Sequence, residues 1–449
     1  MVTGLKRWFS LLLALTFFLL PLQAQAESAD VPDTYSDAYV VMDADTGQVL
    51  VAKNADKREY PASITKVLTC ALVLENRIPM DEVLTASQEA VEGISYDSTQ
   101  LYLAVGEKMT VEQLLYGTMV RSANDAANVL AERVGGTQKA FAELMTQKAA
   151  SLGATNSHFA NPHGLPDQNH YTTAYDMALI TRYALGIEGF QKLFSTVKYT
   201  IPSTNAITDA RPLTTVNKLI NPAHKYYYEY ATGSKLGWTP ESQYTLVSTA
   251  EKNGMRLICV AMRSGDDSYK YLDTVNLFEY CFDNFTSIEF TPAEAEAFMV
   301  PLFDGDLYLA DVMVSGIGSY RLLVPKGVRT ADISASYDVP SRYEDAESIA
   351  PTVTFRLGDA GAATSLGTFP LSVNILPADG QDNSASMVLD ATREVARRPW
   401  AEVMRDLLWV IVPAGFLILL LTISLIVQLM HKNTKRYIYI DPMKRKFKW

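Results

Sequence analysis

Two apolar segments, one near each end, constrain this chain of 449 residues more than any other feature. The first runs for 15 residues from Trp8 to Leu22, behind the cationic pair Lys6-Arg7 and ahead of Ala24-Gln25-Ala26. That layout is typical of a secretory signal, and the run is shorter than the roughly 20 residues that a membrane-spanning helix needs. We therefore predict a signal peptide over residues 1–26, cleaved after Ala26, rather than an uncleaved anchor.

The second segment, Leu407–Met430, is 24 residues long and carries no charge. As a helix rising about 1.5 Å per residue it spans about 36 Å, enough to cross the hydrocarbon core with some tilt. The tail at 431–449 carries a net charge of +6, and positive segments stay in the cytoplasm. We expect a single-pass protein of a bacterial plasma membrane, with residues 27–406 exported and the basic tail close to anionic membrane lipid.

The exported part is strongly acidic. The whole chain has a net charge of −11; the leader contributes +2 and the tail +6, which leaves −19 for residues 27–406. So acidic a surface is a poor match for nucleic acid, which binds basic proteins. The three cysteines, Cys70, Cys259 and Cys281, form no CxxC pair and no cluster with histidine, so we expect small buried residues rather than a metal site.

Apolar patterns predict one domain of helices and antiparallel strands over residues 30–287. Hairpins are expected at Ala38–Lys53, around Asp45-Thr46-Gly47, and at Tyr244–Met262, around Lys252-Asn253-Gly254. Helices are expected over Ser63–Leu74, Thr110–Val134 with a break at 121–124, Gln138–Leu152, Ala174–Leu185, and from Leu277 onward.

Composition changes after about Ile288, where short β-rich runs alternate with Gly, Pro and Asp. This pattern predicts a small all-β domain over 288–380. Its runs are Leu307–Val314, Tyr320–Val324, Ile333–Tyr337, Thr352–Leu357 and Leu371–Ile375. Residues 381–406 are interpreted as a linker or stalk that leads to the membrane helix at 407–430 and the tail at 431–449.

Three short motifs contain residue types that could take part in catalysis. Ser63-Ile64-Thr65-Lys66 lies at a predicted helix start, Ser122-Ala123-Asn124 at the predicted helix break, and Lys235-Leu236-Gly237 just before the second hairpin. Each motif alone occurs by chance in many chains. Their order along the chain and their structural contexts give them weight as a set.

Together the motifs fit a serine enzyme that forms an acyl intermediate. A hydroxyl at a helix start is exposed, and the helix N-terminus favours developing negative charge. Lys66 lies three residues after Ser63 on the same helical face. For Lys66 to act as a base its pKa must be lowered, which burial and a second cation, Lys235, would achieve. Ser122 could relay a proton, and Asn124 could hold a substrate carbonyl or Lys66 itself.

These residues resemble the serine penicillin-binding proteins and β-lactamases, and more closely the low-molecular-mass D-alanyl-D-alanine carboxypeptidases of peptidase family S11. The resemblance covers about residues 30–285 and rests on YPASITKVLT, MVRSANDAANVLAE, NPHGLPDQNHYTTAYDMALI and NGMRLICVAM. It implies the α/β (α+β) penicillin-binding or β-lactamase-like transpeptidase fold, with an antiparallel sheet flanked by helices and a mostly helical insert. The small all-β domain and one C-terminal transmembrane helix are also usual in the family.

The resemblance implies that Ser63 is the nucleophile, that Lys66 is its base, and that Ser122 and Asn124 complete the catalytic set. The backbone N–H groups of Ser63 and Trp238 could form the oxyanion hole. The implied substrate-binding residues are Lys235, Leu236, Gly237, Trp238, Thr239 and Lys270. The implied substrate is the peptidoglycan stem peptide, which loses its terminal D-Ala through an acyl-Ser63 intermediate; β-lactams would acylate the same serine, and no cofactor is implied.

Two positions depart from the family pattern. Leu236 stands where the family has threonine, and the lost hydrogen bond to a charged carboxylate costs about 1.5–3 kcal/mol. Lys270 stands where we expect a carboxylate-binding arginine, and lysine lacks the bidentate fork. Thr239 matches a family position and is expected to compensate in part. We predict weakened or shifted carboxypeptidase activity with the nucleophile machinery intact.

Two alternatives stay open at this stage. A β-lactamase would need a carboxylate placed for deacylation, and no motif for one is evident. A catalytically weakened penicillin-binding scaffold is the other alternative, and Leu236 would be the first residue at which the catalytic pattern is lost. Against it, Ser63, Lys66, Ser122, Asn124 and Lys235 are all present. His163, in Pro162-His163-Gly164-Leu165, is interpreted as a turn residue near the site, because Lys66 already fills the role of base.

Overall fold

The computed structural model of the chain describes residues 30–292, 298–315, 317–342, 351–358 and 364–377. The predicted signal peptide, stalk, membrane helix and tail lie outside these ranges. Within them, none of the helices is long and apolar enough to cross a membrane. The described residues fall into two compact units, one of residues 30–292, 317–338, 352–358 and 364–370, the other of residues 298–315, 339–342, 351 and 371–377.

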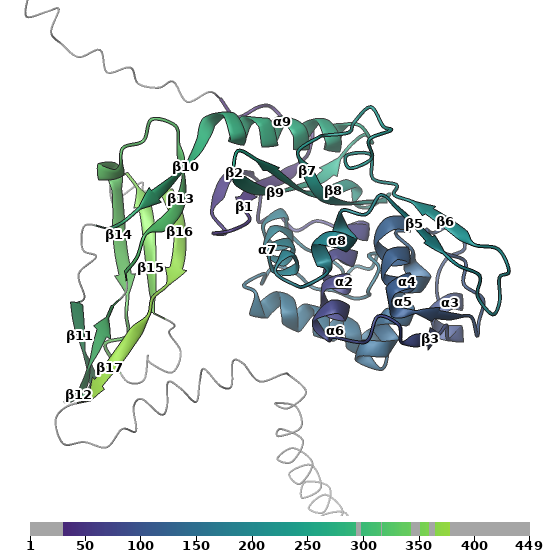
Figure 1. Ribbon diagram of the computed structural model, residues 1–449, viewed down its shortest axis with the longest axis horizontal. Helices are drawn as coiled ribbons and strands as arrows, with labels where there is room; N and C mark the ends of the chain where they lie inside the picture. The colour runs from purple at the N-terminus through teal and green to yellow at the C-terminus, as the bar shows by residue number, and fades with distance from the viewer. Residues whose placement is uncertain (1–29, 293–297, 316, 343–350, 359–363, 378–449) are drawn as a thin grey trace, which may run out of the picture. The chain divides into compact units, whose positions relative to one another are not determined.

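A five-stranded antiparallel sheet organises the first unit (Figure 1). In spatial order its strands are β2 (Val49–Lys53), β1 (Ala38–Asp43), β9 (Met255–Ser264), β8 (Gln243–Lys252) and β7 (Ala231–Thr239). Both predicted hairpins are confirmed, as β1–β2 and β8–β9. Asp43 closes the first turn, since its carboxylate accepts hydrogen bonds from the N–H and the hydroxyl of Thr46 at 3.1 and 2.7 Å.

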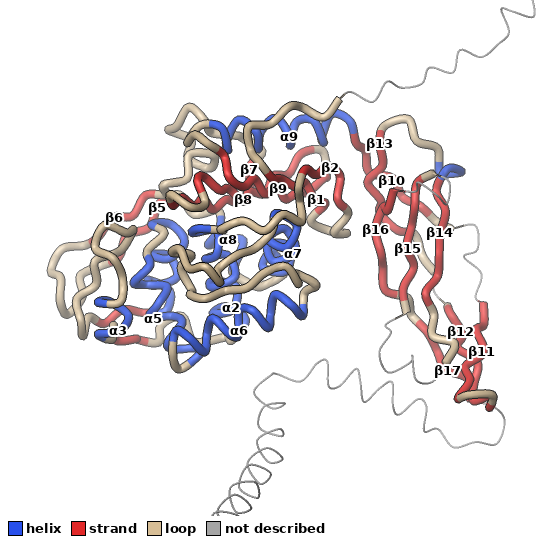
Figure 2. Tube along the Cα trace, turned by 180° about the vertical axis from the view of Figure 1, so that it is seen from behind, coloured by secondary structure: helices blue, strands red, loops and turns tan. Residues whose placement is uncertain are grey.

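Alternation along the strands directs side chains into two hydrophobic cores. Val40 and Val260 belong to the first core, which packs against α2 (Lys66–Glu75), α5 (Asn124–Gly135) and α7 (Ala174–Leu185). Val41 and Cys259 belong to the second core, which packs against α9 (Tyr269–Asn284). We call these two sides of the sheet the α2 face and the α9 face; Figures 1 and 2 show the helices on either side.

Helix α9 is longer than its sequence suggests. It begins at Tyr269, not at Leu277 as predicted. The segment 269–276 is polar enough to hide the helical pattern, yet it buries Tyr271 and Asp273. The Asp273 carboxylate accepts hydrogen bonds from the backbone N–H groups of Tyr35 and Ser36. Burial of polar residues through such contacts is not visible in a hydrophobic pattern.

The predicted broken helix at 110–134 is confirmed. It consists of α4 (Val111–Tyr116), one π-helical turn η2 (Gly117–Arg121), and α5. A capping box starts it: the N–H of Gln113 donates to the Thr110 hydroxyl at 3.2 Å, and the N–H of Thr110 donates to the Gln113 side chain at 3.0 Å. The break falls at Ser122, so the second motif lies at a junction between two helical segments.

The first unit contains further helices and short strands on and around the α2 face of the sheet. The predictions for α6 (Gln138–Ser151) and α7 are confirmed. The helix predicted over Ser63–Leu74 is confirmed, as η1 (Ala62–Thr65) followed by α2. The sequence did not indicate several short elements: β3 (Val83–Thr85), α3 (Gln88–Glu92), β4 (Lys108–Thr110), α8 (Phe190–Phe194), β5 (Lys198–Ile201) and β6 (Arg211–Thr214). Segments of three to five residues are too short to show a period.

Strands also follow α9, as predicted. In the first unit, β10 (Phe285–Phe290) pairs with β13 (Tyr320–Pro325), and a separate sheet is formed, after the turn η3 (Thr330–Asp332), by β14 (Ile333–Asp338), β15 (Thr352–Leu357) and β16 (Thr364–Pro370). Aromatic side chains join these strands, with ring centroids of Tyr320 and Phe355 4.9 Å apart. The second unit contains an antiparallel sheet of β11 (Phe298–Asp304), β12 (Leu307–Val314) and β17 (Val373–Pro377).

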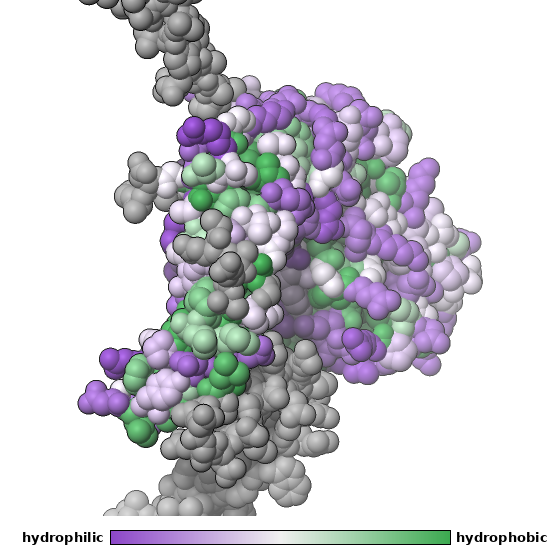
Figure 3. All heavy atoms as spheres, turned by 60° about the vertical axis from the view of Figure 1, so that its left-hand side comes forward, coloured by the Kyte–Doolittle hydropathy of each residue, from purple (hydrophilic) through white to green (hydrophobic). Residues whose placement is uncertain are grey.

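On the face that Figure 3 shows, hydrophilic residues cover most of the helix-containing part, and hydrophobic residues form only scattered patches. The cysteines do not contribute to the surface. Cys70, Cys259 and Cys281 are all buried and free, which confirms the prediction of small buried residues.

Candidate active site

Ser63 lies in the tight turn η1, and Lys66 is the first residue of α2. Ala62, just before the serine, has a φ of 49°, a left-handed conformation that is unfavourable for a residue with a side chain. Two hydroxyl groups hold this backbone: Thr65 donates to the carbonyl of Ala62 at 2.8 Å, and Thr245 of β8 donates to the carbonyl of Pro61 at 2.9 Å. The serine is therefore fixed in place from both the helix and the sheet.

The side chain of Lys66 is fully buried and contacts three oxygen atoms. Its Nζ lies 2.9 Å from Ser63 Oγ, 2.7 Å from Asn124 Oδ1 and 2.6 Å from the carbonyl oxygen of His163. Burial, and next the positive charge of Lys235, hold the pKa of Lys66 well below its usual value. A neutral amine that donates to Asn124 and His163 keeps its lone pair for the hydroxyl of Ser63.

The second motif lies where η2 ends. Ser122 has a φ of 68°, so the chain leaves the π-helical turn in a left-handed conformation before Asn124 starts α5. The next residue, Asp125, is fully buried, and its carboxylate accepts the N–H groups of Leu101 and Leu103, each at 3.0 Å. This clamp ties a neighbouring loop to the start of α5 and stabilises the position of Asn124.

The third motif lies on β7, at the edge of the sheet. Lys235 Nζ donates to Ser122 Oγ at 2.9 Å and to the carbonyl of Leu236 at 2.7 Å. Burial lowers the pKa of Lys235 to about 7. A Cβ on Gly237 would lie 2.6 Å from the backbone nitrogen of Ser63, so only glycine allows β7 to approach the serine this closely. The structure thus brings Ser63, Lys66, Ser122, Asn124 and Lys235 together.

Two buried histidines lie beside the site. Lys66 contacts the carbonyl of His163, while the His163 ring accepts the N–H of Leu165 at 3.2 Å, as fits a turn residue. His170 was not singled out by sequence. Its Nδ1 accepts the N–H of Ala160 at 3.1 Å, so its Nε2 carries the proton and donates to the Thr65 hydroxyl at 2.9 Å. Burial lowers the pKa of His170 to about 3, which keeps the ring neutral.

Glycine is required where the histidine turn meets the nucleophile. Gly164 has a φ of +89°, and a Cβ there would lie 1.9 Å from the carbonyl oxygen of Ala62. The Pro162-His163-Gly164-Leu165 segment therefore packs directly on η1. The glycine after His163 indicated a turn, but nothing in the sequence indicated that Gly164 would contact the backbone of Ala62.

Two of the predicted substrate-binding residues have partners within the protein. The Thr239 hydroxyl donates to the Ser242 hydroxyl at 3.0 Å and accepts the N–H of Ser242 at 3.1 Å, so it stabilises the β7–β8 turn. Lys270 has no exposed side-chain surface and forms an ion pair with Asp267. Leu236 packs against the second core on the α9 face, and Trp238 is 53% exposed.

The site offers a nucleophile, a base and a second cation, which is the equipment for acyl transfer. Among the described residues, no group of three or more His, Cys, Asp or Glu side chains is placed to hold a metal ion. The antiparallel sheet is flanked by helices, and a half-buried serine beside a buried lysine faces a second lysine from an edge strand. This arrangement defines the class of serine acyl-transfer enzymes with the penicillin-binding fold.

Comparison with known proteins identifies the family. The family model described as D-alanyl-D-alanine carboxypeptidase, peptidase S11, matches residues 24–266. The chain belongs to this family and is a serine-type D-alanyl-D-alanine carboxypeptidase, a peptidase of the hydrolase class.

Individual relatives agree with this assignment. The chain is 33% identical over 251 residues to the D-alanyl-D-alanine carboxypeptidase DacF of Bacillus subtilis, covering 55% of this chain and 62% of that protein. It is 29% identical over 344 residues to DacA of Haemophilus influenzae, covering 75% and 83%. The solved structure of penicillin binding protein 5 from H. influenzae matches with a TM-score of 0.61 and 28% identity, over 78% of this chain and 99% of that one.

Proposed function

We propose that this chain is an exported, membrane-anchored carboxypeptidase that removes the terminal D-Ala from peptidoglycan stem peptides through an acyl-Ser63 intermediate. The contact that carries the proposal is the 2.9 Å approach of Lys66 Nζ to Ser63 Oγ, made by a buried lysine whose pKa is lowered. A lysine in that state accepts the proton that serine must lose to become a nucleophile.

Acylation begins when Ser63 Oγ attacks the carbonyl carbon of the penultimate D-Ala and its proton passes to Lys66. The negative charge on the carbonyl oxygen is stabilised by the backbone N–H groups of Ser63 and Trp238. Ser122, hydrogen-bonded to Lys235, then gives its proton to the nitrogen of the leaving D-Ala and is reprotonated from the lysines. The C–N bond breaks, D-Ala departs, and the peptide remains as an ester on Ser63.

Hydrolysis of the ester by water returns the enzyme to its starting state. A β-lactam ring presents the same carbonyl chemistry, so we expect it to acylate Ser63 as well. The structure gives no support to a β-lactamase, in which a carboxylate activates the deacylating water. Asp125, the acidic residue next to the second motif, uses its carboxylate oxygens on the N–H groups of Leu101, Leu103 and Ala126.

The proposed location follows from the sequence at the two ends. A signal peptide at 1–26 exports the catalytic domain at 30–287, and a span at 407–430 with the basic tail at 431–449 holds it on the plasma membrane. The all-β segment at 288–380 and the linker at 381–406 would separate the site from the bilayer, so that it can reach the cell wall.

The test is release of D-Ala from a pentapeptide ending in D-Ala-D-Ala, followed by chromatography. We expect release by the native enzyme and none by Ser63→Ala. Lys66→Ala should slow release by about 10²–10⁴-fold, the usual contribution of a general base. Release that survives Ser63→Ala would contradict the proposal.

A further inference from the structure

The conformation of the turn that carries Ser63 depends on one carbonyl group. Ala62 has a φ of 49°, and a residue in this conformation needs the surrounding structure to hold it there. The peptide bond between Ala62 and Ser63 is planar and trans, so the Ala62 carbonyl and the Ser63 N–H point in opposite directions. Contacts that fix the carbonyl therefore also fix the direction of the Ser63 N–H.

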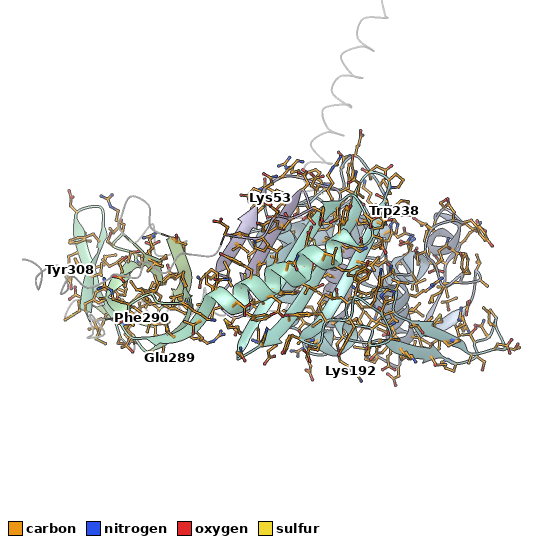
Figure 4. All side chains as sticks on the ribbon, turned by 90° about the horizontal axis from the view of Figure 1, so that it is seen from above. Lys53, Lys192, Trp238, Glu289, Phe290 and Tyr308 are labelled. Carbon is orange, nitrogen blue, oxygen red and sulfur yellow. The ribbon has the colours of Figure 1, made fainter. Side chains whose placement is uncertain are left out.

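The Ser63 nitrogen lies against strand β7, where a Cβ on Gly237 would come within 2.6 Å of it. Trp238, whose N–H is the other donor of the proposed oxyanion hole, follows Gly237 on this strand. Figure 4 shows Trp238 at the end of α9 that lies away from Glu289 and Phe290. The two donors come from separate elements, so the direction of the Ser63 N–H is set by the contacts of η1.

A chain of three hydrogen bonds ends on the Ala62 carbonyl. The N–H of Ala160 donates to His170 Nδ1 at 3.1 Å, and His170 Nε2 donates to the Thr65 hydroxyl at 2.9 Å. That hydroxyl donates to the carbonyl oxygen of Ala62 at 2.8 Å. His170 and Thr65 are both buried. Gly164 packs on the last bond, since a Cβ there would lie 1.9 Å from the Ala62 oxygen and 2.8 Å from Thr65 Oγ1.

His170 gives this chain its direction. A threonine hydroxyl can donate or accept, and its hydrogen rotates to suit its neighbours. Because the N–H of His170 Nε2 points at the Thr65 oxygen, the hydroxyl hydrogen is left for the Ala62 carbonyl. Burial lowers the pKa of His170 to about 3, so at neutral pH Nδ1 remains an acceptor for the N–H of Ala160.

Resting on the proposed function, we propose that His170 is a positioning residue for acylation, which acts through Thr65 and Ala62 to aim the Ser63 N–H at the developing oxyanion. A donor that is aimed in advance needs no reorganisation when negative charge forms on the substrate carbonyl oxygen. The benefit arises in the transition state, so its loss slows acylation without weakening the binding of the acyl donor.

The experiment follows acylation of the full chain by penicillin, using intact-mass spectrometry over a range of times and penicillin concentrations. These data separate the maximal rate constant of acylation from the dissociation constant of the complex that forms before it. His170→Asn keeps an acceptor near the N–H of Ala160 but is too short to reach Thr65. His170→Gln has a side-chain N–H that can occupy the place of Nε2.

We expect His170→Asn to lower the maximal rate constant by about ten- to a hundredfold, less than the roughly 10²–10³-fold cost of deleting an oxyanion donor outright. The dissociation constant should not change. The rate constant of His170→Gln should stay within about threefold of that of the native enzyme, because the donor to the Thr65 hydroxyl is kept.

Two further variants test whether His170 acts through Thr65. Thr65→Val removes the hydroxyl and should itself slow acylation by about ten- to a hundredfold. Adding His170→Asn to Thr65→Val should then cost little more, whereas independent effects would multiply. His158→Asn is the matched control, because the exposed ring of His158 contacts the carbonyl of Asn169 instead, and it should leave acylation unchanged.

A native rate constant in folded His170→Asn, a change confined to the dissociation constant, or effects that multiply in the double variant would each overturn the inference. Circular dichroism and the melting temperature report whether each variant folds. If His170→Asn does not fold, Thr65→Val decides, and an unchanged rate constant there overturns the inference. These outcomes leave the proposed function standing, which fails only if penicillin does not acylate the native chain.

Discussion

Lys66 and Lys235 set the pH dependence expected of acylation. Burial and the charge of Lys235 lower the pKa of Lys66, so the rate should rise with pH as Lys66 loses its proton. Lys235, with its pKa lowered to about 7, loses its own charge above neutral pH. Lys235→Met keeps the volume and removes the charge, so the pKa of Lys66 should rise. We expect the acid limb of the acylation profile to move to higher pH; an unmoved limb would contradict this coupling.

Leu236 is the residue at which the site departs from the family pattern. A threonine hydroxyl at the same place could donate to a terminal carboxylate, and a hydrogen bond to a charged group is worth about 1.5–3 kcal/mol. Leu236→Thr should therefore raise kcat/KM for D-Ala release from the free-acid pentapeptide by about ten- to a hundredfold. Equal rates for the native and substituted enzymes would show that Leu236 does not limit recognition of the carboxylate.

Much of the site could be predicted from the sequence, because Ser63, Lys66 and Asn124 belong to short local motifs. The sequence could not show the contacts of residues whose partners are distant in the sequence or lie across a turn. Thr239 bonds to Ser242, and Lys270 bonds to Asp267, and neither partner has a signal of its own. The contact of His170 with Thr65 could not be predicted for the same reason, since it joins positions 105 residues apart.

Among the elements, the approach of β7 to η1 is the most demanding. Gly237→Ala would place a Cβ 2.6 Å from the nitrogen of Ser63 and force the strand and the turn apart. Displacements of about 1 Å in an active site can cost about a hundredfold in rate, so we expect acylation to fall by that order. Gly265→Ala is the matched control, since a Cβ there meets nothing within 4 Å. Similar rates for the two variants would contradict the role of this contact.

Long periodic elements were predictable and short ones were not. The spans of α6 and α7 and the first two hairpins follow from the pattern of apolar residues. By contrast, β3 and β4 have only three residues each, and the first two turns of α9 contain polar residues that hydrogen bonds allow to be buried, so they show no apolar pattern. The elements most important for the site, η1 and η2, include or adjoin residues with positive φ that tertiary contacts stabilise.

For the whole molecule, we expect residues 407–449 to hold the enzyme on the membrane. The full chain, expressed in a bacterium, should sediment with membranes and resist extraction by high salt. A chain that ends at residue 406 should appear in the soluble exported fraction with its D-Ala release intact. Retention of that shorter chain in salt-washed membranes would place the anchor elsewhere.

The whole mechanism depends on a covalent acyl intermediate at Ser63, which intact-mass spectrometry of residues 27–400 with penicillin would detect. We expect one added penicillin mass on the native protein and none on Ser63→Ala. Absence of the adduct from the native protein, or its persistence in Ser63→Ala, would contradict this mechanism.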